Sequence, residues 1–350
     1  MNSNFTQRLV DKNLNFEDLE RDLKSLNKGS KVPTKYWNIF SDFIKSYFQI
    51  ASQNQADFMT CKRVITSFAQ VIIELANNPQ PFQHFHTAVR TPFDYYALGL
   101  DLLRPIVDLK HSHLKGLDQL KEIQKKLDKK ENVFLFANHQ SEADPQLISL
   151  LLEPYFPKLA EDMIFVAGQR VVTDPLAVPA SLGRNLLCIY SKKYFDFEKE
   201  KRAQMQEHNK KAIQILANLI DEGGKCIYIA PSGGRDRRNP EGIFTVAPFD
   251  PQSIQLCRLI GTKSKRPTHF YPLALRTHGI LPPPDGLQVE LGEKRTINTD
   301  WIAAGFGNAI SFTEDTTLNK EERKQQAALY AWNLVNDLYG LLSNKSVKST

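Results

Sequence analysis

The chain has 350 residues, of which 41% are hydrophobic and 24% charged, and these proportions are typical of an ordinary soluble globular protein. No apolar run reaches the roughly 18 residues that a membrane-spanning helix needs, so we expect no transmembrane segment and at most peripheral membrane contact. The net charge of +6 is modest: it suits an anionic substrate or an acidic partner without establishing either, and we expect no nucleic-acid partner.

The N-terminus and the cysteines indicate the compartment. The first residues lack the apolar core of a secretory signal, and acidic residues appear by Asp11, which argues against an attached transit peptide. Four cysteines are far apart and lack metal-ligand spacing: Cys61, Cys188, Cys226 and Cys257. We therefore expect buried thiols in a reducing compartment.

Residues 1–78 predict a small helical bundle, because apolar residues recur at helical spacing in three segments and none of them alternates as a strand does. The recurring residues are Phe16, Leu19, Leu23 and Leu26, then Trp37, Phe40, Ile44 and Phe48, then Val64, Phe68, Ile72 and Leu75. Pro79 and Pro81 bracket a single residue, where no helix continues. We expect two domains, a helical bundle over 1–78 and a second domain over 79–350.

The second domain alternates helices with short apolar strands. The aromatic-rich segment 82–110 is typical of core packing, although a pocket there is an alternative. Strands are expected at 133–137, 163–167, 186–190, 226–230, 270–275 and 287–291, and helices at 114–127, 144–152, 198–222 and from a capping box, Asn319-x-x-Glu322, to about Leu342. This alternation predicts an α/β fold with a mixed, largely parallel sheet covered by helices on both faces.

A histidine and an aspartate flank a turn in the segment 133–152. The strand ends at Asn138-His139, and Asp144-Pro145 predicts a helix N-cap followed by a proline in the first turn. Residues five apart lie about 140° apart on a helix, so His139 and Asp144 can meet only across a turn. The carboxylate would then hold one imidazole nitrogen and leave the other as a general base. The alternative, a lone loop histidine beside a capping aspartate, carries equal weight on this stretch alone.

Two basic segments follow other strands. In Pro231-Ser-Gly-Gly-Arg-Asp-Arg-Arg238, glycines permit close approach of an anion and guanidinium groups can bind phosphate oxygens, although for this segment alone a tight turn with solvated arginines is slightly favoured. Lys192 and Lys193 follow the 186–190 strand, so one lysine can reach the same edge of the sheet. His84, His86, His111 and His113 lack acidic or cysteine companions, and we expect ordinary surface or core residues and no metal site. His278 is expected in a structured loop.

Four segments in order resemble one enzyme family. Asn138-His139-x₄-Asp144 resembles the first signature block of the glycerolipid acyltransferases, 230–237 their phosphate-binding block, and 269–275 their proline-containing strand block. The segment 181–193 is similar to the soluble, plastid-type glycerol-3-phosphate acyltransferases in particular. Together the four blocks cover roughly residues 130–290.

The resemblance implies roles for individual residues. His139 would be the general base, oriented by Asp144, and Lys193, Arg235 and Arg237 would bind the substrate phosphate, with Arg238 exposed. The plastid-type family has a Lys-His pair where this chain has Lys193-Tyr194, which makes Tyr194 only a candidate contact, together with Ser232 and Gly233. No metal or organic cofactor is implied.

The implied activity is glycerol-3-phosphate 1-O-acyltransferase, the first step of phospholipid biosynthesis. A fatty acyl group would pass from an acyl carrier protein or coenzyme A thioester to the sn-1 hydroxyl of glycerol 3-phosphate, by direct attack without an acyl-enzyme. The implied compartment is a bacterial cytoplasm or a plastid stroma. The alternatives are a lysophosphatidate acyltransferase and a catalytically silent lipid- or carrier-binding protein.

Overall fold

The computed structural model describes residues 16–79, 81–191, 199–283, 292, 295–313 and 315–343.

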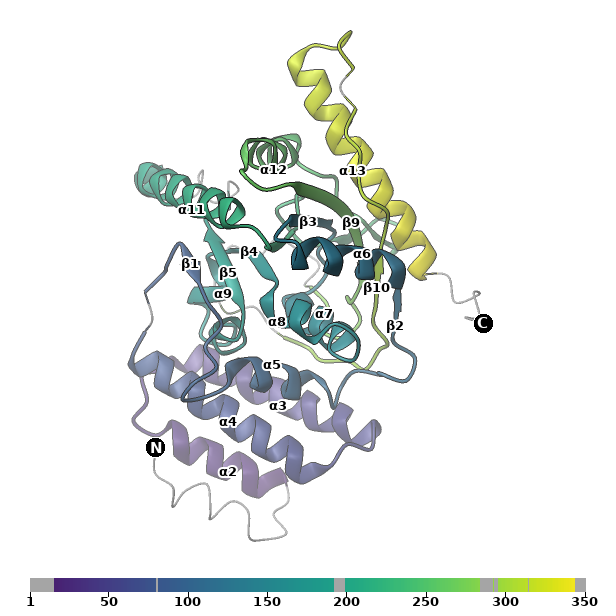
Figure 1. The fold of residues 1–350 in the computed structure, drawn as a ribbon. Helices are drawn as coiled ribbons and strands as arrows, with labels where there is room; N and C mark the ends of the chain where they lie inside the picture. Colours follow the sequence, from purple (N-terminus) through teal and green to yellow (C-terminus); the bar gives the residue numbers. More distant parts are fainter. Residues whose placement is uncertain are drawn as a thin grey trace.

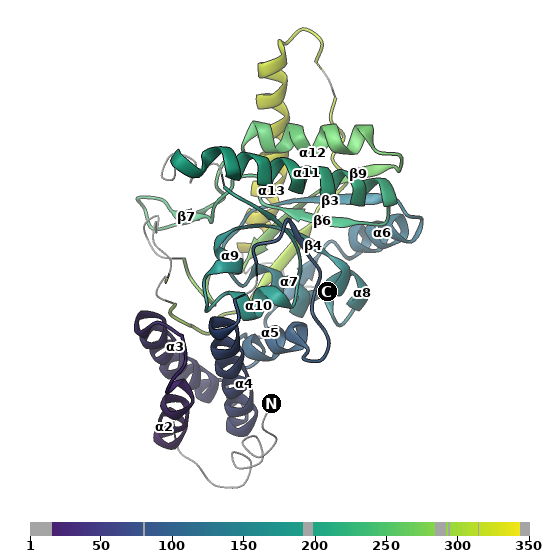
Figure 2. The ribbon, with the colours of Figure 1, turned by 90° about the vertical axis from the view of Figure 1, so that its left-hand side faces the viewer.

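Helices form one end of the molecule. The helices α2 (Phe16–Asn27), α3 (Thr34–Gln53) and α4 (Phe58–Asn77) lie together below the rest of the chain in Figures 1 and 2. The Asp57 carboxylate caps α4 by accepting from Thr60 N at 2.7 Å. The predicted N-terminal helices are confirmed.

An eight-stranded sheet in the described residues forms the centre of the remainder. In spatial order its strands are β1 (Phe85–His86), β5 (Asn185–Ile189), β4 (Ile164–Gly168), β6 (Cys226–Ile229), β3 (Asn132–Ala137), β9 (Thr268–Arg276), β10 (Ala303–Phe306) and β2 (His113–Lys115). Only the pairs β1–β5 and β9–β10 are antiparallel; the others are parallel. The predicted mixed, largely parallel sheet is therefore confirmed.

Strand β3 lies between β6 and β9, and all six of its residues are buried. Alternate residues contact different cores, as the two-residue period of a strand requires. Val133 and Leu135 join a core that also contains residues of the N-terminal helices, whereas Phe134 and Phe136 join a second core on the other face. Both faces of the sheet are thus covered, as predicted.

Different helices cover the two faces. The first core includes α5 (Tyr95–Leu103), α6 (Leu117–Asp128), α7 (Asp144–Leu152) and α8 (Pro157–Asp162), and the short helices α9 (Arg170–Thr173) and α10 (Val178–Leu182) lie nearby. The second core is formed with α11 (Arg202–Glu222), α12 (Pro251–Lys263) and α13 (Lys320–Ser343). Figure 2 shows α11 and α12 on the side of the sheet away from α5 and α7. None of the helices in the described ranges is long and apolar enough to span a bilayer.

Some local expectations need correction. The helix predicted from residue 114 begins at Leu117, because Gly116 has a positive φ of 83° and residues 113–115 form the edge strand β2. The long helix expected from 198 begins as a 3₁₀ turn, η2 (Lys199–Lys201), before α11. The strand expected at 287–291 lies outside the described residues.

Other local expectations are confirmed. The capping box opens α13: Asn319 Oδ1 accepts from Glu322 N, and Glu322 Oε2 accepts from Asn319 N. All four cysteines are free and buried. The division between 78 and 79 stays a prediction, and α4 shares its core with α5 and α10.

Candidate active site

The candidate site begins where β3 ends. Asn138 continues the strand with its side chain instead of its backbone: Nδ2 donates to Leu275 O at 3.0 Å, and Oδ1 accepts from Leu275 N at 2.7 Å. From the other neighbouring strand, the Tyr228 hydroxyl donates to Asn138 O at 3.0 Å. The turn that follows is therefore held on both sides by the sheet.

His139 and Asp144 meet across this turn. His139 Nδ1 lies 2.7 Å from Asp144 Oδ2; the imidazole is 30% exposed and the carboxylate is fully buried. The carboxylate also accepts from Gln140 N at 2.9 Å, from Ser141 N at 3.1 Å and from the Thr277 hydroxyl at 2.6 Å. The turn predicted for this pair is present.

Asp144 does not cap α7 as expected. The helix begins at Asp144 itself, Ala143 occupies the N-cap position, and no side-chain cap is present. The carboxylate instead points back to the amides of Gln140 and Ser141, which precede the helix. The N-cap prediction was wrong because those two amides, Thr277 and His139 compete for the same carboxylate.

The arginine loop, residues 230–238, lies directly against this turn. Asp236 N donates to His139 O at 2.6 Å. The Asp236 carboxylate is fully buried and accepts from Asn138 Nδ2 at 2.8 Å, Gln140 Nε2 at 3.3 Å and Ala247 N at 2.9 Å. Burial raises the pKa of Asp236 to about 6, although these three hydrogen bonds act in the opposite direction.

Sequence reasoning assigned no role to Asp236. The one indication of a role in the sequence is that Asp236 is an acidic residue between two arginines, Arg235 and Arg237. Its side chain bonds to the turn on both sides of His139. Asp236 therefore links the predicted phosphate-binding segment to the predicted general base.

Arg235 belongs to a partly buried network of charges. Its Nη1 lies 3.9 Å from Glu142 Oε1, and Glu142 Oε2 accepts from Arg295 Nε and Nη2 at 3.3 and 3.0 Å. Arg295 Nη2 also lies 3.2 Å from Asp174. Burial opposes the charge on Arg295, but Glu142 and Asp174 raise its pKa above the ordinary value. The network brings Arg235 to the same turn as His139, since Glu142 lies within that turn.

The remaining predicted ligands differ in placement. Arg237 is partly buried in β7 (Arg237–Arg238), which pairs with β8 (Phe244–Thr245), and Arg238 is exposed, as expected, with its guanidinium over Phe244. The Ser232 hydroxyl donates to Gly234 O, and Gly233 N donates to Ala230 O, so the turn itself uses both donors. Lys193 and Tyr194 lie outside the described residues.

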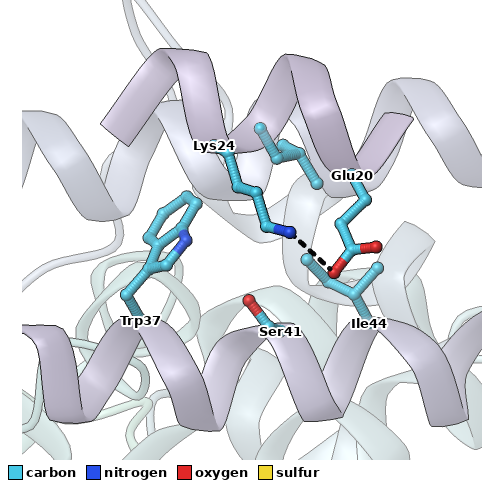
Figure 3. A pocket seen from close by; sticks show the side chains of 6 residues that line it. Glu20, Lys24, Trp37, Ser41 and Ile44 are labelled. Atoms are coloured by element: carbon cyan, nitrogen blue, oxygen red, sulfur yellow. Dashed lines mark ion pairs between the residues drawn. The ribbon is translucent and has the colours of Figure 1, made fainter. Parts of the chain in front are cut away.

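Four further histidines, His84, His86, His111 and His113, and one pocket lie outside this site. His86 bonds to Leu182 O, His111 to Asp108, and His84 and His113 stack on His208 and Trp301. Within the described ranges no three His, Cys, Asp or Glu side chains gather as a metal site. A shallow pocket between α2 and α3 is lined by apolar side chains and by the Glu20–Lys24 ion pair, and it contains no residue of the candidate site (Figure 3).

Comparisons with known proteins give relatives over most of the chain. The family model described as Acyltransferase matches residues 116–276. The chloroplast glycerol-3-phosphate acyltransferase of Phaseolus vulgaris is 35% identical over 332 residues, which are 94% of this chain and 72% of that protein. The Arabidopsis thaliana protein of the same name is 34% identical over 343 residues, covering 95% and 73%.

Two further matches have different coverage. The chloroplast glycerol-3-phosphate acyltransferase ATS12 of Cucurbita moschata is 37% identical over 316 residues, 89% of this chain and 68% of that one. Among solved structures, the 1-acyl-sn-glycerophosphate acyltransferase PlsC of Thermotoga maritima is 15% identical with a TM-score of 0.37, covering 70% of this chain and 78% of that one.

Proposed function

Because the chain belongs to the family of glycerol-3-phosphate acyltransferases, we propose that it transfers a fatty acyl group from a thioester to the sn-1 hydroxyl of glycerol 3-phosphate. The product is lysophosphatidate. The observation that carries the proposal is the contact between His139 Nδ1 and the buried Asp144 carboxylate, beside an arginine loop hydrogen-bonded to His139 O. That arrangement supports the proposal, because the proposed base and the proposed phosphate ligands then lie at one edge of the sheet.

The hydrogen bonds of Asp144 support Nε2 of His139 as the proposed base. Its carboxylate accepts from two backbone amides, which only donate, so it serves as an anionic acceptor. His139 Nδ1 therefore carries the hydrogen, and Nε2 presents its lone pair. Nε2 takes the proton of the substrate hydroxyl as the oxygen attacks the thioester carbonyl. The imidazolium then returns the proton to the departing thiolate, and Asp144 stabilises the cation without taking the proton.

The substrate phosphate binds to cations on the same edge. Arg235 and Arg237 hold the phosphate oxygens through charge-assisted hydrogen bonds, and Lys193 contributes a third cation. Glu142 keeps the Arg235 guanidinium close to the turn. A phosphate fixed in this way positions the three-carbon alcohol for His139, which lowers the entropic part of the barrier.

The acyl donor is an acyl carrier protein thioester, with a coenzyme A thioester as the alternative donor. The compartment is a plastid stroma or a bacterial cytoplasm. The four free, buried thiols support a reducing environment, and the chloroplast relatives support the first of these two.

The test is an acyl-transfer assay. The purified chain is incubated with labelled glycerol 3-phosphate and acyl-acyl carrier protein, with His139→Ala as the inactive control. We expect labelled lysophosphatidate from the wild type alone. Acylation of added lysophosphatidate but not of glycerol 3-phosphate would make the chain a lysophosphatidate acyltransferase. Binding of both substrates without turnover would make it a silent binding protein.

A further inference from the structure

Arg295 has no role in the proposed mechanism, yet it lies at the centre of the charged network beside the candidate site. Its side chain is 8% exposed, and two acids share its guanidinium. Glu142 accepts from Nε and Nη2, and Asp174 lies 3.2 Å from Nη2. Because Glu142 lies in the turn between His139 and Asp144, Arg295 binds a carboxylate of the turn that contains the proposed base.

Asp174 holds Arg295 from the other side. The Asp174 carboxylate is 5% exposed; Oδ1 accepts from Leu176 N at 2.9 Å, and Oδ2 accepts from Gly292 N at 3.2 Å. These backbone hydrogen bonds fix the carboxylate in the loop that follows α9. The guanidinium of Arg295 therefore has a defined place between the loop after α9 and the turn after β3.

Glu142 contacts its two arginines unequally. Its Oε2 lies 3.3 and 3.0 Å from Nε and Nη2 of Arg295, whereas its Oε1 lies 3.9 Å from Arg235 Nη1. The last distance is too long for a hydrogen bond, so Glu142 attracts the Arg235 guanidinium without accepting from Nη1. An arginine and a carboxylate that pair directly form hydrogen bonds of about 2.7–2.9 Å. Arg295 makes the close contacts to Glu142, and Arg235 makes the distant one.

The longer distance matters because Arg235 is a proposed ligand of the substrate phosphate. A guanidinium binds phosphate through the same fork of N–H groups that it offers to a carboxylate. An acid paired directly with Arg235 would therefore compete with the substrate. At 3.9 Å, Glu142 keeps the guanidinium near the turn without a direct pair of this kind.

We propose that Arg295 is a positioning residue for binding of the substrate phosphate: it binds Glu142 and so prevents this carboxylate from closing onto Arg235. The proposal rests on the proposed function, and Arg295 itself contacts neither substrate. Without Arg295, Glu142 pairs directly with Arg235 and draws it from the phosphate. Binding of glycerol 3-phosphate then weakens, whereas the contact between His139 and Asp144, which does not include Glu142, is kept.

The experiment measures kcat, the KM for both substrates, and the Kd of glycerol 3-phosphate by calorimetric titration of the full chain. The proteins are the wild type, Arg295→Gln, Arg235→Ala and the variant that combines both substitutions. Arg104→Gln is the matched control, because Arg104 also bridges two acids, Asp101 and Glu153, at the end of α5.

In Arg295→Gln we expect KM and Kd for glycerol 3-phosphate to rise about tenfold, which corresponds to the lower end of the range for a hydrogen bond to a charged group. The kcat and the KM for the acyl donor should change little. In the Arg235→Ala background, Arg295→Gln should cause no further rise, because its effect passes through Arg235. Arg104→Gln should match the wild type.

Several outcomes would overturn the proposal. One is a wild-type Kd in Arg295→Gln, and another is a tenfold loss that persists in the Arg235→Ala background. Equal rises in both KM values with a lower kcat would indicate a structural role instead. If Arg295→Gln fails to fold, Arg295→Lys keeps a cation between the two acids but offers Glu142 no planar fork. A smaller rise in Kd then supports the proposal, and a wild-type Kd contradicts it. Failure of the proposed function is distinct, because then the wild type does not acylate glycerol 3-phosphate.

Discussion

The backbone amide of Asp236 donates to the carbonyl oxygen of His139 at 2.6 Å. The two residues are 97 positions apart in the sequence. Because Asp236 is bonded to the backbone of His139, the predicted base, the bond also brings the neighbours of Asp236, Arg235 and Arg237, to that base. The buried carboxylate of Asp236 strengthens the link through Asn138 and Gln140. The site is therefore one hydrogen-bonded unit made from the ends of β3, β6 and β9.

The first prediction concerns the base. His139→Ala should lower kcat by about 10²–10⁴-fold, because a general base typically contributes that much. Asp144→Asn should also be severely impaired, since its amide cannot accept from all four present donors and the imidazole loses its fixed tautomer. Steady-state kinetics provide the measurement, with thermal unfolding and glycerol 3-phosphate binding as controls. A near-normal kcat in His139→Ala would refute the assignment.

The second prediction concerns the phosphate. Arg235→Ala and Arg237→Ala should each raise KM for glycerol 3-phosphate, because a charge-assisted hydrogen bond contributes on the order of 1.5–3 kcal/mol. Arg238→Ala is the matched control, since that side chain is exposed and lies over Phe244. KM for the acyl donor should change little. If both KM values rise equally, the loop has a structural role instead.

Part of this site could be predicted from local pattern. The apolar run 133–137 and the spacing of His139 and Asp144 suffice for a strand and a turn, but they favour a paired histidine no more than a lone loop histidine. The cap assigned to Asp144 failed because Thr277, 133 residues away, shares the carboxylate. The links through Asp236, Arg295 and His278 join segments about 100–150 residues apart, and no periodicity in one sequence encodes such contacts. The strands β1 and β2 were missed because they have only two and three residues, and β10 was missed because its two alanines and one glycine are weak strand formers.

The third prediction concerns Asp236. In Asp236→Asn an NH₂ group replaces one carboxylate oxygen. This NH₂ must face either Ala247 N or the side-chain amides of Asn138 and Gln140, and because all of these groups donate, one donor then faces another donor. An unsatisfied buried group costs about 1–3 kcal/mol, so we expect that loss in the free energy of unfolding together with a lower kcat. Asp250→Asn is the control, because asparagine caps a helix such as α12 as well as aspartate does. Denaturant unfolding and kinetics would measure both, and wild-type values for both would contradict the linking role.

The fourth prediction concerns pH and His278. Burial lowers its pKa from 6.5 to about 4 on folding, so between these values the unfolded chain binds a proton that the folded chain does not. The stabilisation is therefore complete above pH 6.5 and is lost as pH falls towards 4, by at most about 3 kcal/mol and less where solvent screens the ring. His278→Phe lacks this titration. The stability of the wild type relative to the variant should decline over that window, and a constant difference in denaturant unfolding would refute the neutral histidine.

The last prediction concerns the acyl carrier protein, which is acidic, and two basic clusters that differ in position. Lys125 on α6 and Lys129 at its C-cap are both exposed, and this helix precedes β3 and ends near the amino edge of the sheet. Lys201 and Arg202 are exposed where η2 meets α11, after the carboxyl end of β5. The strands β5, β4, β6 and β3 are parallel, so the second cluster lies towards the edge at which His139 follows β3. We therefore expect the carrier to approach over Lys201 and Arg202.

Charge reversal separates the two clusters. Lys201→Glu with Arg202→Glu should lower kcat/KM for acyl-acyl carrier protein several-fold at low salt with little change in kcat, because complementary charge acts mainly on the association rate. Lys125→Glu with Lys129→Glu is the matched control of equal charge change. Raising the salt should shrink the difference, since exposed charges are screened over about 10 Å at 0.1 M. Coenzyme A thioesters should show a smaller effect because they lack a protein surface. If the α6 variant shows the larger loss, the carrier approaches from the other edge, and if neither variant changes the rate, both clusters are solvated surface.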